Sequence, residues 1–229
     1  MAGINLGSSG VGGSKTALGI EILQSRKFLG EFIERHKLYA DLLAASGWDS
    51  SNNRIKYDGD LYDIESKTWV RSAKMPQAAI PSQLEGHGAF VKVLGISQSS
   101  DTGFIQVSVE HYSPHIAKLW VDLLVLDLNA EIRKQDVTDA EASINYLREQ
   151  LGATSLAELK TIFYELIEEQ TKTIMLANSR PEYLFRTIDP AVANEKKIRP
   201  QRALICIAGV IVGGGLGLLM VFGQYLLRK

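Results

Sequence analysis

The sequence contains a single cysteine, Cys206, which lies inside a long apolar run near the C-terminus. The rest of the chain can therefore form neither a disulfide nor a metal site built from thiolates. The formal net charge of -1 also lacks the strongly positive balance that is typical of nucleic-acid-binding domains. These shortages exclude disulfide-rich scaffolds and thiolate zinc folds, and we expect no nucleic-acid partner.

Catalytic signatures are missing as well. The sequence has no G-x-S-x-G, no P-loop and no G-x-G-x-x-G placed after a strand. Two of the four histidines, His111 and His115, are four residues apart, but no H-E-x-x-H pattern surrounds them. The Gly/Ser-rich residues 8–15 lack the spacing and the preceding strand of a phosphate loop. We therefore expect a protein that is not an enzyme and has no catalytic residue, cofactor or metal.

No charged residue occurs between Ala203 and Leu227. An apolar run of this length matches the hydrocarbon thickness of a bilayer, at about 1.5 Å of rise per helical residue. The sequence thus predicts a C-terminal transmembrane helix that holds the preceding chain at a membrane surface. Small residues every four positions let membrane helices approach closely, although glycine is also common in such helices without a contact. Both readings stay open for the three glycines at this spacing: Gly209, Gly213 and Gly217.

The pattern before this run changes from helical to extended. Apolar residues recur at helical spacing over residues 16–46 and predict a helical run that Gly47 ends. A β-hairpin is predicted farther along, with strands over 90–96 and 104–111. The segment 62–70 fits either a short strand or a helical turn. In the second strand of the hairpin, three apolar residues alternate with polar ones, the period of a half-buried strand: Ile105, Val107 and Val109.

A long helix follows. Ser113 and Pro114 predict its start, with serine as N-cap and proline at the first helical position. No glycine or proline interrupts the chain from there to Leu151, so we expect one helix of about 57 Å. Apolar residues along it follow alternating steps of four and three, interrupted only by Arg133, as in a heptad seam. A helix of this length must project from a small domain or pack on another chain.

A second helix is predicted after a break at residues 152–154. Ser155 and Glu158 have the spacing of a capping box, and the helical pattern runs to Asn178. Because the connection is short, the two helices are expected to lie antiparallel as a helical hairpin. Residues 185–188 are predicted to form a strand that leads toward the apolar C-terminal run.

These patterns define an α+β fold, in which a mixed α/β base carries the long helical hairpin and precedes a transmembrane helix. The expected parts are a flexible leader, the base, the hairpin, a return strand with its linker, and the membrane helix with a short tail: residues 1–15, 16–113, 114–178, 179–200 and 201–229. An exposed heptad seam favours association between copies. We therefore expect a homo-oligomer held by the long helices through Leu119, Leu123, Leu126, Ile144 and Leu147.

Three segments, residues 17–36, 101–129 and 183–205, carry a resemblance to a known family. The last is the most specific, because it combines a predicted strand, an Asp-Pro-Ala, a basic spacer, a proline and a glycine-rich apolar helix. Together the segments resemble the Wzz-type chain-length determinants of bacterial surface polysaccharides, also called polysaccharide co-polymerases. The resemblance extends over nearly the whole chain, and the family's order of elements is the order predicted above.

The resemblance implies an inner-membrane protein whose periplasmic α/β domain bears a long helical hairpin and assembles into ring-like homo-oligomers. Such proteins have no known catalytic residues. They set the length of polymers, such as the O-antigen of lipopolysaccharide, that a Wzy-type polymerase builds from lipid-linked units. The implied partners are further copies of the chain, the polymerase, the growing lipid-linked polysaccharide and inner-membrane lipid. The residues that match the family's second membrane helix, where contact with the polymerase is placed, are Pro200, Gly209, Gly213 and Gly217.

The sequence departs from the family at its start. Family members have a first membrane helix and strands ahead of the glycine-rich stretch, so we expect this copy to be truncated at the N-terminus. Basic residues are more numerous before the apolar run than after it, which by itself would place residues 1–200 in the cytoplasm. The first membrane helix of such a protein usually sets the orientation, so the periplasmic expectation is kept. Two other functions stay open: a tail-anchored coiled-coil membrane tether, and a modulator of exopolysaccharide or enterobacterial common antigen length.

Overall fold

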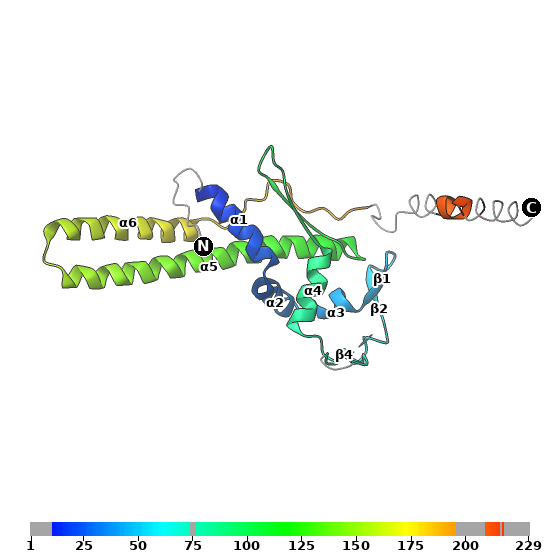
Figure 1. Ribbon diagram of the computed structural model, residues 1–229. Helices are drawn as coiled ribbons and strands as arrows, with labels where there is room; N and C mark the ends of the chain where they lie inside the picture. Colours follow the sequence, from blue (N-terminus) through cyan, green and yellow to red (C-terminus); the bar gives the residue numbers. More distant parts are fainter. Residues whose placement is uncertain (1–10, 74–76, 196–208, 216, 218–229) are drawn as a thin grey trace, which may run out of the picture. The chain divides into compact units, whose positions relative to one another are not determined.

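The computed structural model describes residues 11–73, 77–195, 209–215 and 217 (Figure 1). The chain divides into two compact units, Met1–Ala193 and Asn194–Lys229. The first unit is a mixed α/β structure, and its elements in chain order are α1 (Val11–Gln24), α2 (Arg26–Arg35), α3 (Tyr39–Leu43), β1 (Ala45–Asp49), β2 (Arg54–Tyr57), β3 (Tyr62–Asp63), β4 (Thr68–Trp69), α4 (Gln83–Val93), β5 (Leu94–Gln98), β6 (Ile105–Val109), α5 (Pro114–Ala153) and α6 (Ala157–Ser179). The predicted base and hairpin therefore belong to one unit, whereas the return strand and linker predicted over 179–200 are divided between the two units.

The helical run predicted over residues 16–46 is three helices rather than one. Ser25 has an extended backbone and its hydroxyl accepts a hydrogen bond from the Phe28 amide at 3.2 Å, so it ends α1 and caps α2. Lys37 has a φ of 55°, in the left-handed region, and turns the chain from α2 into α3. Helix α1 begins at Val11, so the predicted flexible leader is wrong for its last residues; residues 1–10 lie outside the described chain.

The predicted strand over residues 90–96 is half helix. Ser82 caps α4 by accepting a hydrogen bond from the Glu85 amide at 3.2 Å, and the helix continues to Val93. Strand β5 then begins at Leu94, directly after the helix. A short apolar run fits a strand and a buried helix equally well, and here the helix cap decides between them.

The strands form three separate two-stranded antiparallel ribbons within the described residues. The undecided segment 62–70 is one of them, the β3–β4 ribbon. The predicted hairpin is another, the β5–β6 ribbon, with Ile96 opposite Val107 and Leu94 opposite Val109. These apolar side chains pack against the core, while the alternate polar residues are exposed.

The core of this unit lies between α2, α4 and α5. Phe90 on α4 packs edge-on against Phe32 of α2 at 5.5 Å and stacks on Trp120 of α5 at 5.4 Å, and all three side chains are buried. Asp127 of α5 is the buried acid of this region. Its Oδ2 accepts a hydrogen bond from Arg35 Nη1 at 2.9 Å and lies 2.9 Å from His36 Nε2. A buried carboxylate needs such partners, and this one fixes the end of α2 to the long helix.

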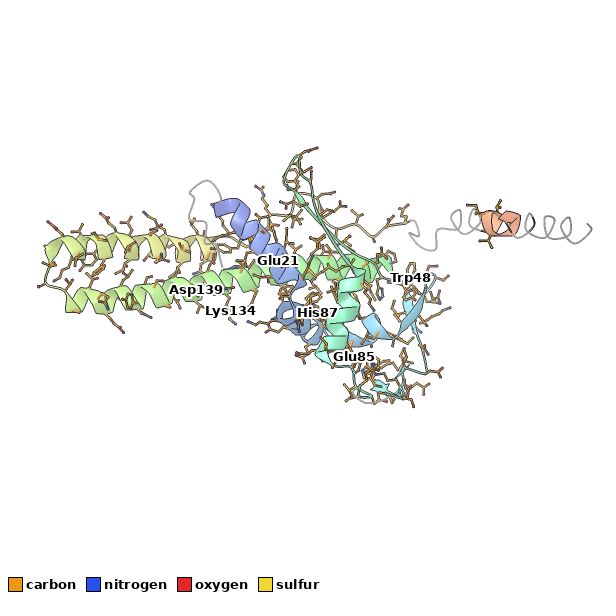
Figure 2. All side chains as sticks on the ribbon, in the orientation of Figure 1. Glu21, Trp48, Glu85, His87, Lys134 and Asp139 are labelled. Atoms are coloured by element: carbon orange, nitrogen blue, oxygen red, sulfur yellow. The ribbon has the colours of Figure 1, made fainter. Side chains whose placement is uncertain are left out.

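Arg71 attaches the β3–β4 ribbon to α4. Its guanidinium donates to the Ala78 and Ala79 carbonyls, at 2.7 and 2.8 Å, and to Glu85 Oε2 at 2.6 Å. The same group lies 5.8 Å from the centre of the Trp69 ring. Arg71 holds the pKa of Glu85, labelled in Figure 2, below its usual value, mainly through this hydrogen bond.

Two glycines of α4 should respond oppositely to alanine. A Cβ on Gly86 would lie 2.8 Å from Tyr39 Cε1, whereas a Cβ on Gly88 would meet nothing within 4 Å. We expect Gly86→Ala to lower the free energy of unfolding by about 1–3 kcal/mol through overpacking. Gly88→Ala should raise it by about 0.5–1 kcal/mol, because alanine restricts the unfolded chain and favours helix. Urea unfolding of the two variants tests this, and equal effects would contradict the close packing at Gly86.

The long helical hairpin predicted from the sequence is confirmed. Helix α5 has 40 residues and begins at Pro114 with Ser113 as N-cap. Figure 1 shows α6 beside the C-terminal half of α5. Helix α6 begins at Ala157 after Leu156, which makes no side-chain cap, so the cap predicted at Ser155 is wrong. The strand predicted over residues 185–188 is also absent, because this segment pairs with no described strand.

The second unit is described only in part. Residues 209–215 and 217 are helical and exposed. Among the described residues of the whole chain, none of the helices is both long enough and apolar enough to traverse a bilayer. Most of the transmembrane segment predicted over 201–229 lies outside the described residues.

Candidate functional site: the apolar face of the helical hairpin

The five residues expected to join copies lie in three different environments. Leu119 and Leu126 are exposed, at 52% and 63% of their surface. Leu123 is half-buried against the core of the base. Ile144 is buried, and Leu147 is half-buried beside α6. The predicted seam is therefore not one continuous surface.

The buried face of α5 changes position along the helix. Near the base the buried apolar side chains follow one another at steps of four, at positions that differ from those of the predicted seam. Beyond them, the buried residues Ala140 and Ile144 belong to the predicted seam. The helix packs on the base in its first half and on α6 in its second, and these neighbours cover different faces. The buried apolar residues of the first half are Trp120, Leu124, Leu128 and Ile132.

An open pocket of about 450 Å³ lies on one side of the hairpin. Its α5 wall includes Tyr146 and Leu147, and its α6 wall is formed by Leu166 and Gln170. Leu159 and Ile162 share the helix face of Leu166, because they are seven and four residues before it. We call the exposed apolar residues on this side the hairpin face: Tyr146, Leu159, Ile162 and Leu166, which are 61%, 38%, 49% and 39% exposed.

Helix α6 buries very little. Of its 23 residues only Ala177 is buried, and its apolar residues beside α5 are half-exposed or exposed. Helices in proteins draw most of their stability from a packed apolar face. The outer hairpin has such a face but no third element within the described residues to cover it. The outer hairpin would therefore gain stability if another apolar surface packed on the hairpin face.

The return segment, residues 180–193, follows α6, and its residues 181–185 lie against α5. Asn129 binds it with three hydrogen bonds: Oδ1 accepts from the Leu184 and Phe185 amides, and Nδ2 donates to the Phe185 carbonyl. Arg133 Nη2 donates to the Pro181 carbonyl at 2.8 Å. The charged residue that interrupts the predicted heptad seam therefore has a structural role.

Asp136 joins this region to α1. Its Oδ2 accepts hydrogen bonds from the Tyr183 hydroxyl at 2.7 Å and from Lys15 Nζ at 2.8 Å. Burial, together with the hydrogen bond to Asp136, raises the pKa of Tyr183 to about 12. The tyrosine therefore stays neutral, and keeps donating to Asp136, over the physiological pH range.

The four histidines each have a neighbour in the protein. His36 faces Asp127, His87 Nε2 lies 3.0 Å from the Gln24 carbonyl, and His111 Nε2 lies 3.0 Å from the Asp41 carbonyl. His115 packs edge-on against the Trp48 ring. In the part of the chain that the structure describes, no three His, Cys, Asp or Glu side chains are grouped to hold a metal ion. The histidines thus contribute to packing and to the joints between elements.

The candidate residues of the C-terminal run are placed only in part. Pro200 lies outside the described residues. Gly209, Gly213 and Gly217 lie in the helical part, and a Cβ on any of them would meet nothing within 4 Å. Their spacing places them on one face, which is open to a neighbouring helix. Nothing in the sequence marks Tyr146, Ile162 or Asn129, because their roles depend on the side from which another segment approaches.

No protein-family model matches this chain, and no curated protein is significantly similar to it.

Proposed function

We propose that this protein is a non-enzymatic regulator of the length of a bacterial surface polysaccharide, such as O-antigen. In this proposal it lies in the inner membrane, with its α/β unit in the periplasm, and acts as an oligomer beside a Wzy-type polymerase. The proposal combines the resemblance of three sequence segments with one structural observation. That observation is the α5–α6 hairpin, whose outer part has an uncovered apolar face and almost no buried residues.

The hairpin face supports self-association. Tyr146, Ile162 and Leu166 lie on one side of two adjacent helices, so a neighbouring copy can cover them together. Burying apolar area at such a contact gives about 25 cal/mol per Å² before the cost of association. An assembly of parallel hairpins would present a fixed outer surface to a growing polymer. That surface would change the chance that the polymer is released after each added unit.

The C-terminal run supplies the second contact of the proposal. A membrane helix with small residues on one face can pack closely against another helix. In the proposal this face, formed by Gly209, Gly213 and Gly217, binds either a neighbouring copy or the polymerase. No step of the mechanism requires a reactive side chain, because the protein acts by positioning other molecules.

Deleting the gene should convert a surface-polysaccharide ladder with a preferred length into one without it. A complementing copy with Gly213→Leu and Gly217→Leu should fail to restore the preferred length, because leucine prevents close helix approach. Val212→Leu serves as control, since it adds volume away from the glycine face. Gel ladders, read at matched protein levels, measure the outcome. A ladder unaffected by deletion would disprove the function and favour the membrane tether instead.

A further inference from the structure

Three hydrogen bonds from Asn129 attach the return segment to α5. Asn129 is 3% exposed and lies on α5, beside the return segment. Its amide oxygen accepts from the Leu184 and Phe185 amides at 2.8 and 2.9 Å, and its amide nitrogen donates to the Phe185 carbonyl at 2.9 Å. These bonds satisfy backbone groups that would otherwise need a strand partner or water. We call this arrangement the Asn129 clip.

Close packing from α1 reinforces the clip. A Cβ on Gly19 would lie 2.6 Å from Leu184 Cδ2 and 2.9 Å from Phe185 Cζ, so α1 lies directly on these side chains. Tyr183 is held by Asp136, which also binds Lys15 of α1. Residues 183–185 are therefore fixed between α1 and α5.

The chain on the far side of the clip is exposed. Ile188 and Val192 are 70% and 78% exposed, and the Thr187 amide is bound by the nearby Glu182 side chain. On the other side of the clip, Arg133 binds the Pro181 carbonyl just after α6 ends. The clip thus lies between the end of the hairpin and a segment whose apolar side chains are exposed.

We propose that Asn129 is a positioning residue, which makes residues 181–185 move with α5. A displacement of residues 186–193 is then transmitted to the middle of α5, and not to the end of α6. Through the clip, the position of the residues that follow Phe185 would thereby determine the position of the hairpin. This last consequence rests on the proposed function, whereas the clip itself does not.

Amide hydrogen exchange of the full-length protein tests the clip. Asn129→Leu removes all three hydrogen bonds and should speed exchange of the Leu184 and Phe185 amides at least about tenfold. Asn145→Leu, at an exposed position of the same helix, should have no effect on these amides. Unchanged exchange in Asn129→Leu, or equal acceleration throughout α6, would overturn the clip.

A distance measurement separates positioning from simple stability. Spin labels at Lys134→Cys and Ile188→Cys, in a Cys206→Ser background, report how residue 188 lies relative to α5. Both positions are exposed. Asn129→Leu should broaden the distance distribution, whereas Asn145→Leu should leave it narrow. A narrow distribution in both variants would overturn the transmission of displacement.

The effect of the clip on function is tested in cells that express Asn129→Leu at the normal protein level. In these cells the preferred polysaccharide length, read from a gel ladder, should change. An unchanged length alongside a released clip would refute control of the hairpin by the clip. Gene deletion remains the separate test of the proposed function. Failure of the proposed function can therefore be distinguished from failure of control by the clip.

Discussion

Replacing Leu124 with alanine should lower the free energy of unfolding by about 2–5 kcal/mol, because the side chain is fully buried and alanine leaves a cavity. Leu126→Ala, two residues farther along the same helix, should change it by no more than about 0.5 kcal/mol. Leu126 is 63% exposed. Denaturant unfolding of the full chain in detergent, followed by circular dichroism, measures both values.

This pair also tests the orientation of α5 on the base. A heptad seam through Leu119 and Leu126 would make Leu126 the important residue, whereas the structure makes it Leu124. A larger loss in Leu126→Ala than in Leu124→Ala would contradict the observed orientation. Leu119→Ala extends the comparison, since this exposed residue should behave like Leu126.

The double variant Ile162→Glu and Leu166→Glu should weaken self-association at least about tenfold, because it places two charges on a surface that must lose water when copies pack. Both residues belong to the hairpin face and are partly exposed, so the fold should tolerate the change. Sedimentation velocity and crosslinking at matched concentrations report the oligomeric state. The same variant should also change the preferred polysaccharide length in cells.

A matched control lies on the other side of α6. Tyr164 and Met175 are 63% and 66% exposed, and helical spacing places them together, away from the hairpin face. Tyr164→Glu with Met175→Glu adds the same charge to the same helix. Loss of association in this variant alone, or equally in both, would show that the hairpin face is not the contact.

Capping residues and uninterrupted helical patterns predicted correctly those elements whose ends depend on neighbouring residues in the sequence. Ser113 and Pro114 mark the start of α5, and its uninterrupted pattern gives its length. The strand predicted over 185–188 failed because strand formation requires a distant partner, and Asn129 binds the adjoining backbone groups instead. The end of α4 around Phe90 was missed because a short apolar run fits the period of a helix and the period of a strand equally well.

The surface of the hairpin was less predictable than the hairpin itself. A heptad pattern assumes one partner along the whole helix, whereas α5 has the base beside its first half and α6 beside its second. Leu119 and Leu126 are therefore exposed while Ile144 of the same predicted seam is buried. Tyr146 could have been noticed as a large ring among polar residues, but only the position of α6 shows which side it faces.

The order of the buried residues along the chain has a consequence for biosynthesis. The buried part of the core cluster runs from Leu23 to Ile132, so it is complete in sequence before α6 leaves the ribosome. Domains tend to fold during synthesis once their contacting segments have emerged. The base can thus pack with the first half of α5 before α6 is synthesised. Residues 183–185, which pack against this cluster and bind Asn129, are synthesised after α6, so the Asn129 clip can close only once the hairpin is complete in sequence.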